Sequence, residues 1–316
     1  MNSDPTIKTM RDVLIEAIYK KMALDERVFF LSADFGAPAL DKLRKDFGDR
    51  FINVGIAEQN LVNIATGLAL EDCIVYAYAI APFLTMRAYE QIRLSLSISA
   101  QVKPVNVNLI GVGGGLSYDV AGPTHHCLED ISLMRLLPNM TVFSPSDWKL
   151  AENFFDYSFD KKTPKYFRLD GKPVSLIYDK VGDLDFEKGF YELVNGDRTC
   201  LVSTGYLTHR ALKAAKETPG VGLIDVFMLK PLDEKRLFET LKKYANVITL
   251  EEAFVNNGGL DCLISKILSD NQSGIKLKRM GVNDKHVFEL GSRNYLHMLN
   301  NLDDESIIKT IKEFSF

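Results

Sequence analysis

A glutamate at the start of an apolar helical pattern is a candidate for acid–base chemistry. Glu58 lies in the run NVGIAEQNLVNIATGLAL, whose apolar residues recur at helical spacing. Burying a carboxylate among such residues is costly unless a donor pairs with it, and buried carboxylates of this kind are active-site candidates. The alternative is a partly exposed glutamate in a first helical turn, where the helix dipole favours a negative charge.

The adjacent histidines of GPTHH are a second candidate. The side chains of His125 and His126 diverge if they lie on a turn, so the pair is a poor metal chelate, and we predict no metal site within this chain. Beside a ligand crevice either imidazole could transfer a proton or stabilise an alkoxide, because histidine titrates near neutral pH. The alternative is a histidine at a helix entry that is hydrogen-bonded to the backbone.

Glycines shortly before this pair form a loop. Gly111, Gly113, Gly114 and Gly115 follow a predicted strand but complete neither GxGxxG nor GxxxxGK[ST], which disfavours a nucleotide-binding loop. We instead expect a loop at the carboxyl end of a strand, where open α/β sheets place their ligand crevices.

Alternating helices and apolar strands position these residues. A helix is predicted over 7–24, and the run VFFLSAD after it indicates a buried strand. Further strands at 73–79, 104–111 and 140–145 alternate with predicted helices at 57–70, 85–100 and 147–158. This pattern is typical of a mostly parallel sheet that is covered on both faces.

The charged, turn-rich segment 179–198 is the predicted junction between two domains. After it, strands are predicted at 199–204, 221–226 and 246–252, again with helices between them. We therefore expect two three-layer α/β/α domains, at 1–185 and, smaller, at 186–316.

Composition excludes several classes of protein. The chain carries 38 Lys+Arg against 42 Asp+Glu, so it has no charge signature for nucleic acid or anionic lipid. Four separated cysteines without a CxxC pair favour reduced thiols in a cytoplasmic protein. The N-terminal sequence does not have the pattern of a signal peptide, and the longest apolar run, at 73–84, is too short to span a membrane.

Four segments, in this order, resemble transketolase: GIAEQN, PFLTMRAYEQIR, GPTHH followed by LPNMTVFSPSD, and MLKPLDE. The resemblance extends over nearly the whole chain. It implies a first domain of the type that binds the pyrimidine of thiamine diphosphate and a second domain like the transketolase C-terminal domain. The chain is also similar to the deoxyxylulose-phosphate synthases, notably in THH, and more distantly to the beta subunits of 2-oxo acid dehydrogenases.

The GDG motif of the family's diphosphate-binding domain does not occur in this sequence. The resemblance therefore implies the C-terminal subunit of a split transketolase. A separate N-terminal subunit with the GDG motif would then hold most of the thiamine diphosphate and its Mg²⁺, and self-association would give a heterotetramer.

The resemblance also implies roles for individual residues. Glu58 matches the glutamate that hydrogen-bonds the cofactor's aminopyrimidine and so promotes formation of the thiazolium carbanion. Phe83 matches the aromatic residue that stacks on the pyrimidine, with core packing as the alternative, and Asp34 matches an aspartate near the cofactor. His125 matches the histidine that faces the reacting carbonyl, and His126 matches the second histidine of the synthase pattern.

The positions that would contact the substrate match the family's pattern only in part. Arg11 in TMRDVL and Arg168 in YFRLDGK match arginines that hold the substrate phosphate, although either could form a salt bridge instead. The loop GVGGGLSYDVAGPTHH lacks the family's usual His-Asp pair and has Ala121 where an acidic residue usually precedes the glycine. Asp119 or Tyr118 is the expected replacement for a contact to the sugar hydroxyls.

The predicted function is transfer of a two-carbon ketol unit from a ketose, expected to be phosphorylated, to an aldose. One alternative is the decarboxylating beta subunit of a 2-oxo acid dehydrogenase, which GPTHH and Arg168 disfavour. Another is a catalytically silent scaffold of the same fold, which Glu58 and both histidines disfavour. The other histidines are expected to be structural: His209, His286 and His297.

Overall fold

The computed structural model describes residues 6–179 and 184–314, which form two compact units. Of these residues, the first unit contains 6–114, 133–143 and 147–179, and the second contains 115–132, 144–146 and 184–314. The histidine pair thus belongs to the second unit, although it precedes much of the first unit in the sequence. Of the predicted junction 179–198, residues 180–183 lie outside the described residues.

The first unit is built on a parallel sheet with the strand order β5-β6-β4-β3-β1-β2. Its strands are β1 (Val28–Ser32), β2 (Phe51–Asn53), β3 (Ile74–Ile80), β4 (Asn106–Val112), β5 (Thr141–Phe143) and β6 (Lys165–Leu169). Every residue of β4 and β6 is buried, as expected for strands that are covered on both faces. The predicted parallel sheet is confirmed.

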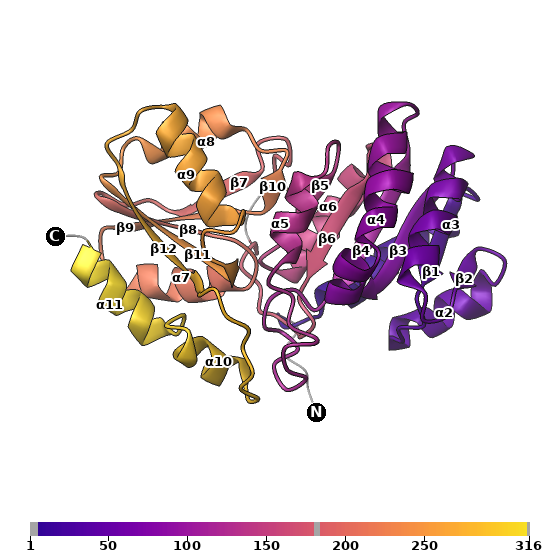
Figure 1. Cartoon of the computed structure of the whole chain (residues 1–316), viewed down its shortest axis with the longest axis horizontal. Helices are drawn as coiled ribbons and strands as arrows, with labels where there is room; N and C mark the ends of the chain where they lie inside the picture. The colour runs from indigo at the N-terminus through magenta and orange to yellow at the C-terminus, as the bar shows by residue number, and fades with distance from the viewer. Residues whose placement is uncertain (1–5, 180–183, 315–316) are drawn as a thin grey trace. The chain divides into compact units, whose positions relative to one another are not determined.

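Helices cover this sheet. They are α1 (Met10–Met22), α2 (Pro38–Asp46), α3 (Glu58–Leu70), α5 (Asp130–Leu136) and α6 (Trp148–Asp160). Helix α1 packs against α6, and α3 packs on β3 and β4. In Figure 1, α3 and α4 lie over the same side of the sheet.

The chain between β3 and β4 differs from the single helix that the sequence predicts at 85–100. Two π-helical segments, η1 (Phe83–Arg87) and η2 (Ile92–Ile98), flank the short α4 (Tyr89–Gln91), and the 3₁₀ turn η3 (Ser99–Gln101) follows. A π turn widens the helix by one residue and so changes the direction of the side chains around it. Such turns are found frequently at functional sites.

The second unit contains a five-stranded sheet with the order β12-β11-β8-β9-β7. Its strands are β7 (Phe190–Val194), β8 (Thr199–Ser203), β9 (Val221–Val226), β11 (Asn246–Phe254) and β12 (Lys276–Val282), and the short β10 (Met228–Lys230) follows β9. Only β7 is antiparallel to its neighbour in this sheet. Strand β7 lies inside the predicted junction 179–198, and the sequence does not predict it. An edge strand with partly exposed and charged positions lacks a clear apolar pattern.

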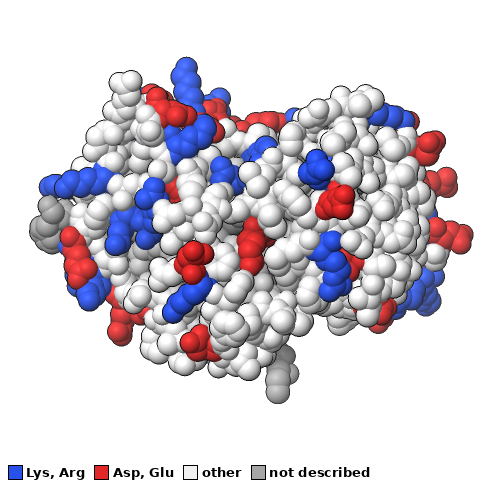
Figure 2. Space-filling model, viewed as in Figure 1, with Lys and Arg blue, Asp and Glu red and all other residues white. Residues whose placement is uncertain are grey.

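Helices lie on both faces of the second sheet, so the predicted α/β/α layering is confirmed. Figure 1 shows α8 (Glu234–Leu241) and α9 (Leu260–Asp270) over one face and α7 (Leu207–Glu217), α10 (Arg293–Leu299) and α11 (Asp304–Phe314) over the other. On the face drawn in Figure 2, acidic and basic side chains are interspersed over the surface. None of the helices in 6–179 and 184–314 is long and apolar enough to cross a membrane.

Candidate functional site

The first candidate group forms where α3 begins. Glu58 is the first residue of α3, and only 4% of its side chain is exposed. Arg87, the last residue of η1, donates from Nη1 to Glu58 Oε2 at 2.7 Å. The buried carboxylate therefore has the donor that its burial requires. Arg87 was not predicted as a site residue, although it lies in PFLTMRAYEQIR, because the π turn that directs it toward α3 has no sequence signature.

Phe83 belongs to the same group. It opens η1, its side chain is half-buried, and the Arg87 guanidinium carbon lies 4.8 Å from the centre of its ring. Arg87 thus contacts both the carboxylate of Glu58 and the ring of Phe83. The structure brings together the two residues that are predicted to hold the aminopyrimidine.

Asp34 lies just beyond β1 and is exposed. Its backbone is left-handed, with a φ of 54°, a conformation that aspartate adopts more readily than most residues. Asn53, at the end of the neighbouring strand β2, donates from Nδ2 to Asp34 Oδ1 at 2.9 Å and accepts from Gly55 N at 3.0 Å. Asp34 is therefore linked to the segment that leads into Glu58.

The two candidate phosphate-binding arginines lie on different elements. Arg168 lies on β6, is 5% exposed and is paired with Gly111 of β4 in the sheet register. Its aliphatic stem packs on Gly114, where a Cβ would lie 2.8 Å from Arg168 Cγ. Arg11 lies in the first turn of α1 and donates from Nε to the carboxylate of Asp12 at 2.8 Å.

The histidines lie in a loop of the second unit that is closed at its base. Gly115 and Cys127 exchange two backbone hydrogen bonds of 2.9 Å, and we call residues 115–127 the histidine loop. His125 is half-buried, and its Nδ1 lies 3.0 Å from the hydroxyl of Thr124. His126 is 4% exposed, and neither of its ring nitrogens has a hydrogen-bond partner in the part of the chain that the structure describes.

Burial favours the neutral form of His126. It lowers the pKa of the imidazole below 6.5, and Asp119 and Glu252 only partly oppose this effect. His126 is consequently a neutral imidazole near neutral pH, able to donate from one nitrogen and accept at the other.

Asp119 is 2% exposed, and backbone amides occupy both of its oxygens. Val120 N donates to Oδ1 at 2.9 Å, and Arg293 N donates to Oδ2 at 2.6 Å. The carboxylate therefore holds the loop, and its expected contact with a sugar hydroxyl stays a prediction.

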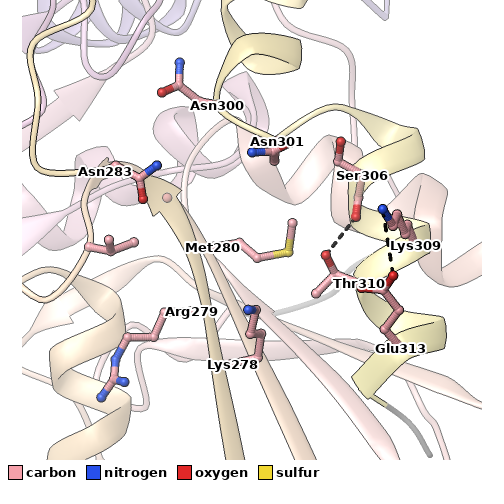
Figure 3. A pocket seen from close by; sticks show the side chains of 12 residues that line it. Lys278, Arg279, Met280, Asn283, Asn300, Asn301, Ser306, Lys309, Thr310 and Glu313 are labelled. Carbon is pink, nitrogen blue, oxygen red and sulfur yellow. Dashed lines mark hydrogen bonds and ion pairs between the residues drawn. The ribbon is translucent and has the colours of Figure 1, made fainter.

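A pocket of about 350 Å³ in the second unit contains none of the predicted site residues. It lies between β12 and α11, where Lys309 pairs with Glu313 and Thr310 donates to the Ser306 carbonyl (Figure 3). Within 6–179 and 184–314, no group of three His, Cys, Asp or Glu side chains could hold a metal ion.

Comparison with known proteins identifies the family. Residues 7–172 match the transketolase pyrimidine-binding domain, and residues 191–307 match the transketolase C-terminal domain. The chain belongs to the transketolase family. The resemblance that the four segments carry is thereby confirmed.

Several transketolase relatives are single chains of similar extent. This chain is 34% identical over 269 residues to an apulose-4-phosphate transketolase subunit of Actinobacillus succinogenes, and the match covers 84% of each chain. It is 30% identical to a 6-deoxy-6-sulfo-D-fructose transketolase subunit of a Clostridium species, over 96% of this chain and 94% of that one.

A solved transketolase has the same fold over nearly the whole chain. It is described as a split gene transketolase in an inactive beta4 tetramer and superposes with a TM-score of 0.85 at 29% identity, over 97% of this chain and 98% of that one. Together with the relatives, this match supports the role of a transketolase subunit and does not favour a dehydrogenase component or a silent scaffold.

Proposed function

We propose that this chain is the C-terminal subunit of a split, thiamine diphosphate-dependent transketolase. The observation that carries the proposal is the buried carboxylate of Glu58, paired with Arg87 at 2.7 Å beside the ring of Phe83. In the transketolase family, the matching glutamate holds the cofactor's aminopyrimidine. The reaction is transfer of a two-carbon ketol unit from a phosphorylated ketose to an aldose.

The residues around Glu58 fit the pyrimidine end of the cofactor. Thiamine diphosphate, when bound, would supply the nucleophilic carbon and the electron sink that ketol transfer needs. Glu58 holds the proton on a ring nitrogen of the aminopyrimidine, and its burial excludes water that would compete for that hydrogen bond. Phe83 offers an aromatic ring for stacking, and the exposed Asp34, just beyond β1, is assigned a place near the cofactor because it matches the family's aspartate.

The diphosphate and its Mg²⁺ belong to a separate N-terminal subunit that carries the GDG motif. The relatives that are named as transketolase subunits and the split-gene transketolase of the same extent support this assignment. We further propose that self-association of the two-subunit complex gives a heterotetramer. The four cysteines are free thiols, which supports a cytoplasmic location for the enzyme.

We assign roles toward the sugar to two histidines and two arginines. Neutral His126 and its neighbour His125 would donate hydrogen bonds to the oxygen of the reacting carbonyl. One of the two imidazoles would then accept the proton of the hydroxyl beside the breaking carbon–carbon bond, so that the shortened aldose leaves with an aldehyde group. Arg168 and Arg11 hold the phosphate of the substrate, because a guanidinium fork can donate two parallel hydrogen bonds to phosphate oxygens. Asp119 or Tyr118 contributes to recognition of the sugar hydroxyls.

Calorimetric titration of thiamine diphosphate with Mg²⁺ tests the shared site. The titrant is added to this chain alone and to its complex with a candidate N-terminal subunit, and ketol transfer from apulose 4-phosphate and from 6-deoxy-6-sulfo-D-fructose is then measured. We expect tight binding and turnover only in the complex. Absence of binding in both samples would contradict the proposal and favour the scaffold.

A further inference from the structure

A buried charged cluster in the second unit has no part in the chemistry described above. Glu252 of β11 is 2% exposed, and Arg293, which opens α10, is 5% exposed. Arg293 Nε donates to Glu252 Oε1 at 2.7 Å, and Arg293 Nη2 donates to Oε2, so the pair is bidentate. The guanidinium carbon also lies 3.6 Å from the centre of the Tyr206 ring.

His297, which the sequence analysis expects to be structural, completes the cluster. Its Nε2 donates to Glu252 Oε1, and its Nδ1 accepts from Arg210 Nε at 2.6 Å, which fixes one neutral tautomer. Burial lowers the pKa of His297. Burial by itself raises the pKa of Glu252, but Arg293 and His297 outweigh this effect and hold it well below 4.5. One negative and one positive charge therefore face each other in the core.

The cluster holds the histidine loop at two points. Glu252 Oε2 accepts from Leu116 N at 3.4 Å, and a Cβ at Gly115 would overlap the same carboxylate. Arg293 N donates to Asp119 Oδ2 at 2.6 Å. Together with the pairing of Gly115 with Cys127, these contacts fix the base of the loop on which His126 stands.

We propose that Glu252 and Arg293 are positioning residues that hold the histidine loop, and through it the imidazole of His126, in the orientation that ketol transfer needs. This inference rests on the proposed function. The ring nitrogens of His126 have no hydrogen-bond partner outside the histidine loop among the described residues, and the backbone of Asp119, which acts on the imidazole, lies in the loop itself. The orientation of His126 therefore depends on the backbone of the loop. A buried ion pair is seldom more stable than apolar residues of the same size, which favours a role other than stability for this one.

Hydrogen exchange of the chain alone tests the hold on the loop without requiring activity. We expect amides of residues 115–127 to exchange at least about tenfold faster in Glu252→Gln than in the unaltered chain. The matched control is Asp304→Asn, which removes the Arg210 ion pair of 2.7 Å at the far side of the cluster and should leave loop exchange unchanged. Unchanged loop exchange in Glu252→Gln would overturn the proposed hold.

Kinetics of the reconstituted complex separate positioning from stability. Because Glu252→Gln leaves Arg293 buried without its partner, the double variant Glu252→Gln/Arg293→Gln, neutral at both positions, is measured beside it. We expect the double variant to regain thermal stability while kcat stays at least about tenfold low and KM changes less than about threefold. Recovery of kcat together with stability would overturn the positioning role.

His126→Gln distinguishes failure of this inference from failure of the proposed function. A loss of kcat in His126→Gln comparable to that in the double variant supports the inference. Unchanged kcat in His126→Gln would overturn the role of His126 and the purpose given to the cluster. Unchanged loop exchange beside a large loss of kcat in His126→Gln would overturn the inference alone.

Discussion

Replacement of Glu58 by Gln separates catalysis from stability. The variant keeps the shape of the side chain but removes the charge. A hydrogen bond to a charged group contributes about 1.5–3 kcal/mol, and proton transfer by a positioned side chain about 10²–10⁴ in rate. Since a factor of ten in rate corresponds to about 1.4 kcal/mol, we expect kcat for ketol transfer to fall at least about 100-fold.

The expected loss of stability is much smaller. Arg87 is 47% exposed, so water screens its ion pair with Glu58, and loss of the pair costs about 1 kcal/mol or less. Activity of the reconstituted complex and thermal unfolding of the chain measure the two effects separately. Glu71→Gln is the matched control, because Glu71 lies exposed just beyond the other end of α3 and should leave both quantities unchanged. Wild-type turnover in Glu58→Gln would refute the assignment of cofactor activation to Glu58.

Three further predictions concern substrate binding, backbone geometry and pH. Arg168→Lys should lower kcat/KM for a phosphorylated donor about 10–100-fold, chiefly through KM, because an ammonium cannot form the fork; equal kinetics would contradict phosphate binding there. Gly115→Ala should lower the free energy of unfolding by about 1–3 kcal/mol, because φ is +64° and the added methyl would overlap the carboxylate of Glu252. Gly274→Ala, which places its methyl in open space, should leave this free energy unchanged, and urea titration compares the two variants. The depressed pKa of His126 means that the folded chain binds its proton more weakly, so stability falls as pH drops below about 6.5. The free energy of unfolding, measured with urea at pH 7.5 and about 5.5, should differ less between the two pH values in His126→Gln than in the unaltered chain. An equal difference in both proteins would refute burial of a neutral imidazole.

Local sequence patterns predict the apolar elements, including the short β5 (Thr141–Phe143), and miss elements with several polar or exposed positions. Strands β1, β3 and β4 stand out because both of their faces are buried, so nearly every residue is apolar. Strand β6 contains Lys165 and Arg168, and their burial depends on partners elsewhere in the chain. Strand β12 is exposed at alternate positions of its first half, where charged residues interrupt the apolar pattern that would predict a strand.

The sequence by itself determined the alternation of helices and strands, the family, and the positions of Glu58 and the histidine pair. These follow from local periodicity and short motifs, since helical and strand preferences depend on neighbouring residues. Only the tertiary structure decided that Arg87 meets Glu58 across 29 residues and that Arg293 holds Asp119 across 174. It also decided that the histidine loop belongs to the second unit. Contacts between residues so far apart depend on how whole elements pack, and no local pattern in the chain encodes them.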